Sequence, residues 1–406
     1  MEYIPLCKEF YTDKSRFNEL YFQRYNSEYA VHLDFSVNGN DAFFLLVPSL
    51  FQSQEKLFHL DKQVKVLSDA LPGKALEQFA TRCLIDEIVL TNDIEGVYSS
   101  RKEIQSVLFE LKENNKRNRY YGLVQKYLML QSKEQISIHS CQDIRDLYNE
   151  LVYNEIRLDN PINLPDGKIF RKESTSVLSV AQKEIHRGVY PEGEIINCMN
   201  KALSVLHNDS IAVFFRIAIF HYLFGYIHPF YDGNGRTSRF ISSYLLAKEF
   251  EPVLGYRISY TIREHLNDYY NAFKLCNDIH SKGDLTPFVL MFTDIVIRSM
   301  QQLVNALEKR YNALNYYLAR IPTLPNAQID KYANLYNLLI QASLFSEDGI
   351  STPELLEVLS VSRSTLSKRL KDGIRAGVIC QKSIGNTHFF SADLNAIDKR
   401  QTNQSS

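Results

Sequence analysis

Glycine and proline are scarce in this chain, and their scarcity limits how many tight turns it can make. The 406 residues include 16 Gly and 12 Pro, about half the usual share. Few turns favour long helices, and most of the chain shows apolar residues at helical spacing. A hydrophobic content of 45% with 23% charged residues is typical of globular proteins. A chain of this length is expected to fold into more than one domain.

The overall charge, the cysteines and the most apolar run exclude several classes of protein. A formal net charge of −1 provides no general attraction to nucleic acid or to an anionic membrane. The 6 cysteines form no CxxC pair, so we expect no zinc site or disulfide framework and predict a cytoplasmic location without a secretory signal. Residues 211–227 contain Arg216 and His221, and therefore predict a buried helix rather than a membrane span.

The patterns divide the chain into four predicted parts. Residues 1–99 contain a β-hairpin, indicated by alternating apolar residues before Asn38-Gly39, and then helices. Residues 100–300 form a helical core, 301–328 a helix with a linker, and 329–400 a separate domain. The expected fold class is mainly α.

One run of twelve residues, HPFYDGNGRTSR from His228 to Arg239, gathers the chemistry. Gly233-Asn234-Gly235 opens a helix, where free N–H groups and the positive end of the helix dipole create an anion site. Arg236 and Arg239 share one helix face and suit phosphate oxygens. Asp232 suits a hard cation such as Mg²⁺, and His228 suits a general base.

Each of these features also has an ordinary structural explanation. A histidine at a helix end is commonly a cap, a Gly-Asn-Gly sequence is commonly a turn, and two arginines three residues apart are commonly solvated. The combination in this order is what favours a phosphate site. It contains no GxxxxGK[ST] P-loop, and it differs from a dinucleotide-binding fingerprint because a helix precedes it.

HPFYDGNGRTSR resembles the signature HxFx[D/E]GNGRxxR of Fic (filamentation-induced-by-cAMP) domain proteins, with every specified position filled. The resemblance is expected to extend over residues 30–300, and it implies a Fic-type helical core with a β-hairpin flap. It also implies transfer of AMP from ATP, with Mg²⁺, to a Ser, Thr or Tyr hydroxyl of a protein target. By this resemblance His228 is the base, Asp232 is the metal ligand, and the ATP-binding residues are Asp232, Gly233, Asn234, Gly235, Arg236, Thr237, Ser238 and Arg239.

A second segment, TNDIEG, resembles the [S/T]xxxE[G/N] inhibitory helix of many Fic proteins, expected here over about residues 84–96. The resemblance implies that Glu95, one helical turn after Thr91, pairs with Arg239 in the place of the γ-phosphate. The protein would then be an auto-inhibited protein adenylyltransferase. The helix dipole alone gives no such indication, since a carboxylate at a helix C-terminus is disfavoured and Glu95 could be an ordinary surface residue.

Further site residues come from weaker resemblances. Tyr269, Tyr270 and Asn277 resemble contacts to the adenine and ribose, although paired tyrosines on a helix equally indicate a core. Ser176, Val177 and Leu178 resemble the flap that aligns a target peptide as an added strand, although the sequence departs from the commoner glycine-rich wording. The family also implies a homodimer.

The C-terminal part predicts helix, turn, helix and two strands, Val378–Lys382 and Thr387–Ser391, which resembles a winged-helix domain. Thr352 before Pro353 indicates a helix start. Residues 361–382 contain six basic residues and one acidic residue. This favours DNA contact through Arg363, Lys368 and Lys371, with protein interaction as the alternative.

Two other functions remain open. The same site, with Glu95 orienting a water molecule, could remove AMP from a modified protein. Alternatively, the chain could be a non-enzymatic DNA-binding regulator that senses nucleotide, although a sensor would not need His228.

Overall fold

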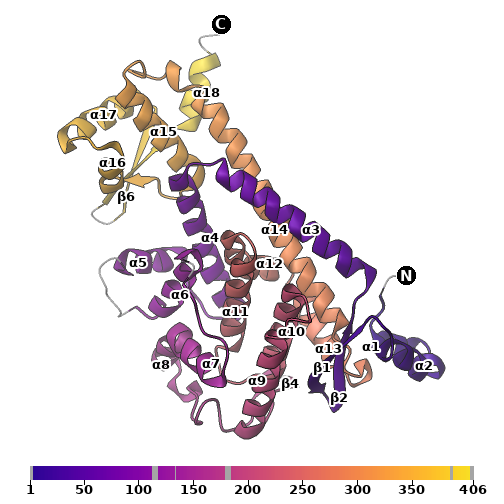
Figure 1. Ribbon diagram of the computed structural model, residues 1–406. Helices are drawn as coiled ribbons and strands as arrows, with labels where there is room; N and C mark the ends of the chain where they lie inside the picture. The colour runs from indigo at the N-terminus through magenta and orange to yellow at the C-terminus, as the bar shows by residue number, and fades with distance from the viewer. Residues whose placement is uncertain (1–2, 112–117, 133, 179–183, 385–386, 403–406) are drawn as a thin grey trace. The chain divides into compact units, whose positions relative to one another are not determined.

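The computed structural model describes residues 3–111, 118–132, 134–178, 184–384 and 387–402, and helices dominate it (Figure 1). The predicted mainly α fold class is confirmed. The chain divides into two compact units: unit 1 contains Met1–Asp61 with Leu84–Gln301, and unit 2 contains Lys62–Cys83 with Gln302–Ser406. Three helices contribute residues to both units: α3 (Pro48–Asp69), α4 (Gly73–Ile94) and α14 (Thr286–Leu318). The finer division into four parts stays a prediction.

The N-terminal part of unit 1 contains the predicted β-hairpin. Helices α1 (Leu6–Thr12) and α2 (Lys14–Tyr25) precede β1 (Ala30–Val37) and β2 (Asn40–Leu45), which pair antiparallel. Asn38 and Gly39 have φ angles of 52° and 74°. Positive φ at both central residues is what a two-residue hairpin turn requires, and Asn-Gly adopts it readily.

Among the described residues, the regular structure in the rest of unit 1 is helical apart from one short hairpin. Its elements are α5 (Arg101–Leu111), α6 (Tyr121–Ser132), α7 (Cys141–Tyr148), the π-helix η1 (Asn149–Tyr153), α8 (Asn154–Asp159), η2 (Pro161–Asn163), β3 (Ser176–Leu178), β4 (Glu184–Arg187), α9 (Glu192–Leu206), α10 (Val213–Ile227), α11 (Asn234–Glu249), η3 (Pro252–Tyr256), α12 (Ile258–Glu264), α13 (Leu266–Asn277) and η4 (Ile279–Ser281). Strands β3 and β4 pair antiparallel.

Helix α10 is the centre of this unit. It packs against α9 and α11 (Figure 1), and eleven of its fifteen residues are buried. The prediction of a buried helix is therefore confirmed. Within the described residues, no helix is both long and apolar enough to cross a membrane. The cytoplasmic location and the homodimer stay predictions.

Unit 2 contains a small helical domain with a three-stranded sheet. Its elements are η5 (Ile321–Thr323), α15 (Asp330–Phe345), β5 (Ile350–Ser351), α16 (Thr352–Leu359), α17 (Arg363–Arg375), β6 (Ile379–Ile384), β7 (Thr387–Ala392) and α18 (Leu394–Thr402). The strand order is β5-β7-β6. The helices and strands expected of a winged helix are present, while the assignment itself stays a prediction.

The start of α16 differs from the prediction. Ser351, not Thr352, is the N-cap, and it forms a capping box with Glu354. The Ser351 hydroxyl accepts from the Glu354 backbone N–H, and the Glu354 carboxylate accepts from the Ser351 backbone N–H at 2.9 Å, so two helix-end donors are satisfied.

The π-helix η1 lies between α7 and α8 and packs closely against α6. A Cβ atom on Gly122 of α6 would lie 1.8 Å from the carbonyl oxygen of Glu150 in η1. Such a distance is far inside van der Waals contact, so only glycine allows the two backbones to approach this closely.

We therefore expect Gly122→Ala to destabilise the protein by roughly 1–3 kcal/mol, the usual cost of overpacking. Gly193→Ala is the matched control, because nothing lies within 4 Å of a Cβ atom there. Thermal unfolding of both variants should show a lowered Tm for Gly122→Ala alone. Equal Tm values for the two variants would mean that α6 and η1 can move apart without a loss of stability.

Candidate active site

The loop between α10 and α11 holds the predicted signature, and its backbone is sharply bent at both ends. His228 caps α10 in the left-handed region, with φ 52° and ψ 63°. This conformation costs a residue other than glycine roughly 1–2 kcal/mol. Gly233, with φ 78°, is the N-cap of α11. The side chain of Asn234 closes the loop by donating to the Phe230 carbonyl at 2.8 Å and accepting from the Phe230 N–H at 2.9 Å.

His228 is held as a neutral imidazole at the start of this loop. Burial, followed by the nearby His186 and Arg171, lowers its pKa to about 3. A ring nitrogen also bonds to the backbone carbonyl of Gly225. Because one nitrogen of a neutral imidazole donates, the other remains an acceptor. His228 is therefore in the form that a general base requires.

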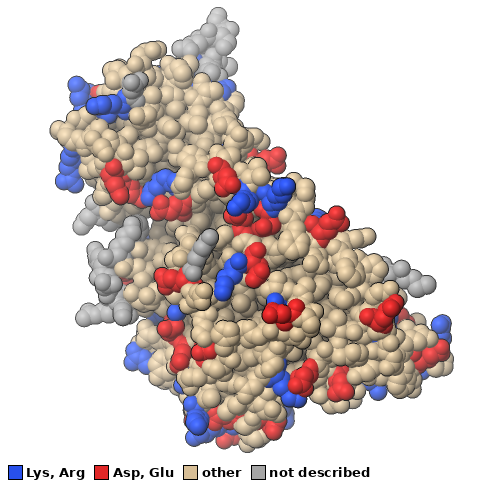
Figure 2. Space-filling model, viewed as in Figure 1, with Lys and Arg blue, Asp and Glu red and all other residues tan. Residues whose placement is uncertain are grey.

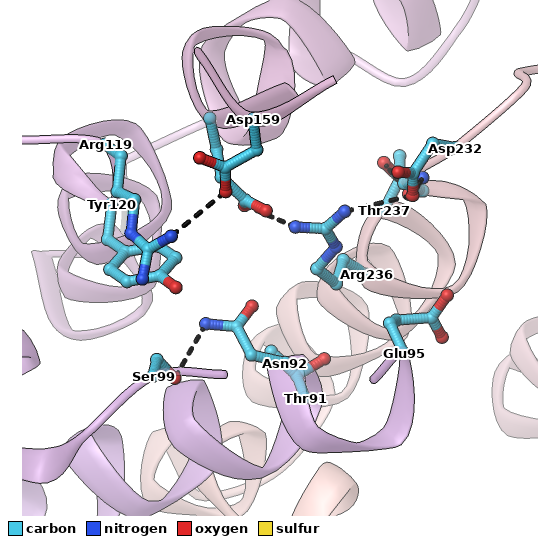
Figure 3. A network of polar contacts seen from close by, with 12 residues as sticks. Thr91, Asn92, Glu95, Ser99, Arg119, Tyr120, Asp159, Asp232, Arg236 and Thr237 are labelled. Carbon is cyan, nitrogen blue, oxygen red and sulfur yellow. Dashed lines mark hydrogen bonds and ion pairs between the residues drawn. The ribbon is translucent and has the colours of Figure 1, made fainter. Parts of the chain in front are cut away.

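Arg236 does not point into solvent but joins two carboxylates. It is fully buried and forms ion pairs with Glu155 of α8 and, at 3.2 Å, with Asp232. Figure 3 shows its guanidinium directed toward Asp232. The carboxylate of Glu155 is itself almost completely buried. These anions outweigh the effect of burial and raise the pKa of Arg236, so the guanidinium stays charged and holds Asp232 in a fixed orientation.

Arg239, three residues further along α11, meets the end of α4. Its Nε donates to the Thr91 hydroxyl at 2.9 Å, and its Nη2 donates to the Thr91 carbonyl and the Glu95 carboxylate, each at 2.9 Å. Arg239 is buried and the side chain of Glu95 is 24% exposed. Burial alone would lower the pKa of Arg239, but Glu95 and the neighbouring tyrosines raise it above its ordinary value.

The Glu95 carboxylate lies in the anion site at the start of α11. A Cβ atom on Gly235 would be 2.0 Å from its Oε1, so the carboxylate lies directly against the backbone of the first helical turn. Free N–H groups and the helix dipole favour an anion at this position. Glu95 thus lies beside the start of α11 while it is paired with Arg239.

The end of α4 is shaped to present Glu95. Gly96 has φ 72°, Val97 donates to the Asn92 carbonyl and Gly96 to that of Asp93, which is the Schellman pattern. The helix begins at Gly73, eleven residues before the predicted start near residue 84, because its apolar face continues toward the N-terminus. Two turns before Glu95, the buried Glu87 accepts from the backbone N–H of Ser259 at 2.9 Å, at the start of α12.

Only some of the remaining residues that were predicted to contact the nucleotide lie beside Arg239 and Glu95. The hydroxyls of Thr237 and Ser238 donate to carbonyls one turn back in α11. Tyr269 is buried, with its hydroxyl 2.8 Å from His221 and bonded to Arg239, while the half-exposed Tyr270 lies near Glu95. Asn277 instead accepts from Tyr222 at 2.7 Å and from Asn38.

The predicted flap segment forms a real hairpin. Ser176 pairs with Arg187 and Val177 with His186, and the register shifts before Leu178 pairs with Glu184. The tip between the strands lies outside the described residues. The hairpin is attached to the end of α10, just before the signature loop, because the His186 ring lies 2.6 Å from the Tyr226 carbonyl.

Asp232 is the residue that could hold a cation. Gly233 N–H and Arg236 both bond to its Oδ1, and 34% of its side chain is exposed. Among the described residues, no group of three or more His, Cys, Asp or Glu side chains is arranged to hold a metal ion. A magnesium ion commonly takes one or two carboxylates and completes its shell with phosphate oxygens and water, so Asp232 fits an ion that arrives with a nucleotide.

Four residues around the site were missed in the sequence. They are Glu87, Glu155, Arg171 and His186, and each lies outside the signature in an ordinary helical or extended pattern. The signal that distinguishes them is a buried ionisable side chain. A single sequence does not show which individual positions are buried.

The comparisons with known proteins agree with the signature. Residues 137–246 match the model of the Fic/DOC family. The chain is 26% identical over 260 residues to "Protein adenylyltransferase Fic" of Aedes aegypti, covering 61% of this chain and 47% of that protein. It is 37% identical over 83 residues to the protein of the same name from Drosophila yakuba, covering 20% of this chain and 15% of that protein. The chain thus spans less than half the length of these relatives.

A solved structure shares the fold. The Fic family protein from Desulfovibrio desulfuricans G20 superposes with a TM-score of 0.52 at 19% identity, covering 86% of this chain and 98% of that one. The helical core with its small hairpin is therefore of the Fic type. Residues 137–246, which contain the complete signature loop, are similar to the Fic/DOC family.

Proposed function

We propose that this protein transfers AMP from ATP to a hydroxyl group of a protein target, and that Glu95 inhibits it. The observation that carries the proposal is the convergence of Arg239 and the α11 N-terminus on one anion position, in the same loop as a neutral His228. The names of the relatives support the reaction class.

The chemistry follows from these positions. His228 takes the proton of the target hydroxyl, whose oxygen forms a bond to the α-phosphorus of ATP. The bond from that phosphorus to the bridging oxygen breaks, and pyrophosphate leaves. Negative charge grows on the leaving oxygens, where Arg239 and the N–H groups of α11 stabilise it. The remaining contribution is the alignment of hydroxyl and phosphate.

Asp232 would hold Mg²⁺ in this site. A bound magnesium ion would neutralise charge on the phosphate oxygens. The role of Arg236 is then to orient Asp232, since Arg236 is buried between Asp232 and Glu155. We therefore assign the outer phosphate contact to Arg239 rather than to Arg236.

Inhibition follows from the place of Glu95. A carboxylate and a phosphate oxygen cannot occupy the same position against Gly235 and Arg239. A nucleotide that binds beside Glu95 would therefore lose the Arg239 contact, and its phosphates would lie out of line for attack. Thr91 strengthens the block because it adds two hydrogen bonds to the same guanidinium.

The basic helix α17 supports a second, separate proposal, contact with DNA through unit 2. Arg363, Lys368 and Lys371 are exposed, whereas Arg369 is buried against Tyr332. Figure 2 shows acidic and basic side chains scattered over the visible face, with basic ones at the edge where Figure 1 draws α17.

Replacing Glu95 by glycine should activate the protein. We expect Glu95→Gly to raise AMP incorporation into itself or into a target, with ATP affinity equal or higher, because the anion site is vacated. Intact-mass spectrometry after incubation with ATP and Mg²⁺, alone and with cell lysate, would detect each added AMP. A folded variant no more active than the parent would show that Glu95 is not inhibitory, and would favour AMP removal or a structural role.

Replacing Arg239 by alanine breaks the same ion pair but should not activate. The variant loses the phosphate contact together with the inhibitory one, so transfer should stay at or below the parent level. Comparing Arg239→Ala with Glu95→Gly in the same assay separates relief of inhibition from general loosening. Activation by both variants would contradict the role of Arg239 in phosphate binding.

Removing the base should affect transfer and not nucleotide binding. In the Glu95→Gly background, His228→Ala should lose transfer by roughly two to four orders of magnitude while ATP affinity is kept. Because the pKa of His228 is lowered to about 3, this residue is neutral from about pH 5 upward. Its titration should therefore add no acid limb to kcat/KM between about pH 5 and pH 8. Full transfer by His228→Ala would exclude it as the base.

Binding of unit 2 to DNA should depend strongly on salt. The full chain is expected to bind random duplex at low salt and to release it as salt rises, because lysine and arginine displace counterions. The double variant Lys368→Glu/Lys371→Glu should abolish this binding, whereas Lys201→Glu, on α9 of unit 1, should not. If the parent chain shows no binding at low salt, the domain has a protein-interaction role.

A further inference from the structure

The end of α10 requires hydrogen-bond donors from elsewhere in the chain. The last carbonyls of a helix have no partner within it, and here the chain turns away at His228. The carbonyl of Phe224 accepts from the His228 N–H at 2.9 Å, and that of Gly225 bonds to the His228 ring. The following carbonyls therefore depend on other segments.

The β3–β4 hairpin and the residues that flank it, here called the hairpin stem, supply those donors in sequence order. The His186 ring reaches the Tyr226 carbonyl at 2.6 Å, and the Val189 N–H reaches that of Ile227 at 3.0 Å. Arg171 serves the next two: its Nε donates to the His228 carbonyl at 2.9 Å, and its backbone N–H to that of Pro229 at 3.2 Å.

Arg171 also binds the hairpin stem itself. Its Nη1 donates to the carbonyl of Glu173 at 2.6 Å, and its Nη2 to that of Val189 at 2.7 Å. These residues lie just before β3 and just after β4. The side chain is fully buried, and the three groups that its guanidinium contacts are backbone carbonyls. The planar fork of a guanidinium can serve several acceptors in fixed directions, which a lysine ammonium cannot.

The packing around Arg171 leaves no room for adjustment. A Cβ atom on Gly188 would lie 2.5 Å from the Arg171 Nη2 and 3.0 Å from the His228 Cβ. Gly188 therefore allows the hairpin stem, Arg171 and His228 to meet at one point. A residue in a left-handed conformation persists only where its surroundings determine it, and here the surroundings of His228 are Arg171 and the stem.

We propose that Arg171 is a positioning residue, which fixes the backbone of His228 to the segments that flank both strands of the hairpin and so aligns a target bound along that hairpin with the base. This inference rests on the proposed function and adds a residue to it. Arg171 has no contact with Asp232 or with Gly233–Arg239 in the described structure, so its effect should fall on transfer and not on nucleotide binding.

The charge of Arg171 has a second consequence. The groups that face His228 are Arg171, His186 on β4 and Asp232 in the loop. Burial, His186 and Arg171 lower the pKa of His228, while Asp232 raises it. Removal of the guanidinium should therefore raise the pKa of His228, and a lysine at this position should keep it low.

The test compares three variants in the Glu95→Gly background. Arg171→Met removes the guanidinium and its charge but keeps an aliphatic side chain of similar length. Arg171→Lys keeps the positive charge but not the planar guanidinium. Arg145→Met is the matched control, because Arg145 also donates to a backbone carbonyl, that of Ile169 at 2.7 Å. ATP affinity, kcat for AMP transfer to a protein target, and Tm would be measured for each.

We expect Arg171→Met to lower kcat about 100-fold, the usual effect of a misplaced catalytic group, with ATP affinity within about threefold of the parent. The kcat of Arg171→Lys should lie between those of Arg171→Met and the parent, and the kcat of Arg145→Met should match that of the parent. If Arg171→Met does not fold, Gly188→Ala, which displaces the same contact from the hairpin side, should give the same pattern. Equal kcat values for Arg171→Met and Arg145→Met would overturn the proposal.

A measurement without turnover separates this inference from the proposed reaction. The His228 ring would be titrated by nuclear magnetic resonance in ¹⁵N-histidine-labelled protein, with His228→Ala for assignment. Its pKa should rise in Arg171→Met and stay low in Arg171→Lys, while buried His221 is unchanged. An unchanged His228 titration in Arg171→Met refutes the inference. Absence of AMP transfer in Glu95→Gly refutes the proposed reaction alone.

Discussion

A buried guanidinium requires an anion, and the arrangement of the site depends on which anion Arg239 receives. Arg239 is fully enclosed between α11 and the end of α4, where an unpaired charge would be strongly destabilising. In this structure Glu95 and Thr91 satisfy it. A triphosphate could satisfy it equally. The competition between an internal carboxylate and an external phosphate for one cation is the physical basis of the proposed inhibition.

Unpaired backbone groups at helix ends bind several of the other ionisable side chains around this site. The N-terminus of α11 attracts Glu95, and the N-terminus of α12 attracts the buried Glu87 from the same helix α4. Helix α4 is thereby attached at two points, two turns apart. The opposite pole, the C-terminus of α10, is satisfied by Arg171. Donors and acceptors that secondary structure leaves unpaired thus determine where the ionisable side chains lie.

Three of the glycines lie at places where backbones or side chains of the site approach closely. Gly235 allows the Glu95 carboxylate to approach the first turn of α11, and Gly188 allows Arg171 to reach His228. Gly233 packs against Val152 and Tyr148, so the signature loop lies directly on the π-helix and its neighbours. In a chain with few glycines, these positions connect the scaffold to the chemistry.

The sequence by itself determined the mainly α class, the Asn38-Gly39 hairpin, the buried helix before His228, and the loop that starts α11. Each depends on local preference: few breakers, alternating or helical spacing, and glycines at a helix start. The resemblance of HPFYDGNGRTSR and TNDIEG to Fic motifs also placed Glu95 beside Arg239 in advance. Only the tertiary structure decided that Arg236 is buried against Glu155, that the Asn277 backbone carbonyl accepts from Asn38, and that Arg171 contacts the backbone of His228. Those contacts join segments 57 to 239 residues apart, and no local pattern specifies them, because a charged residue looks the same in a sequence whether it is solvated or buried.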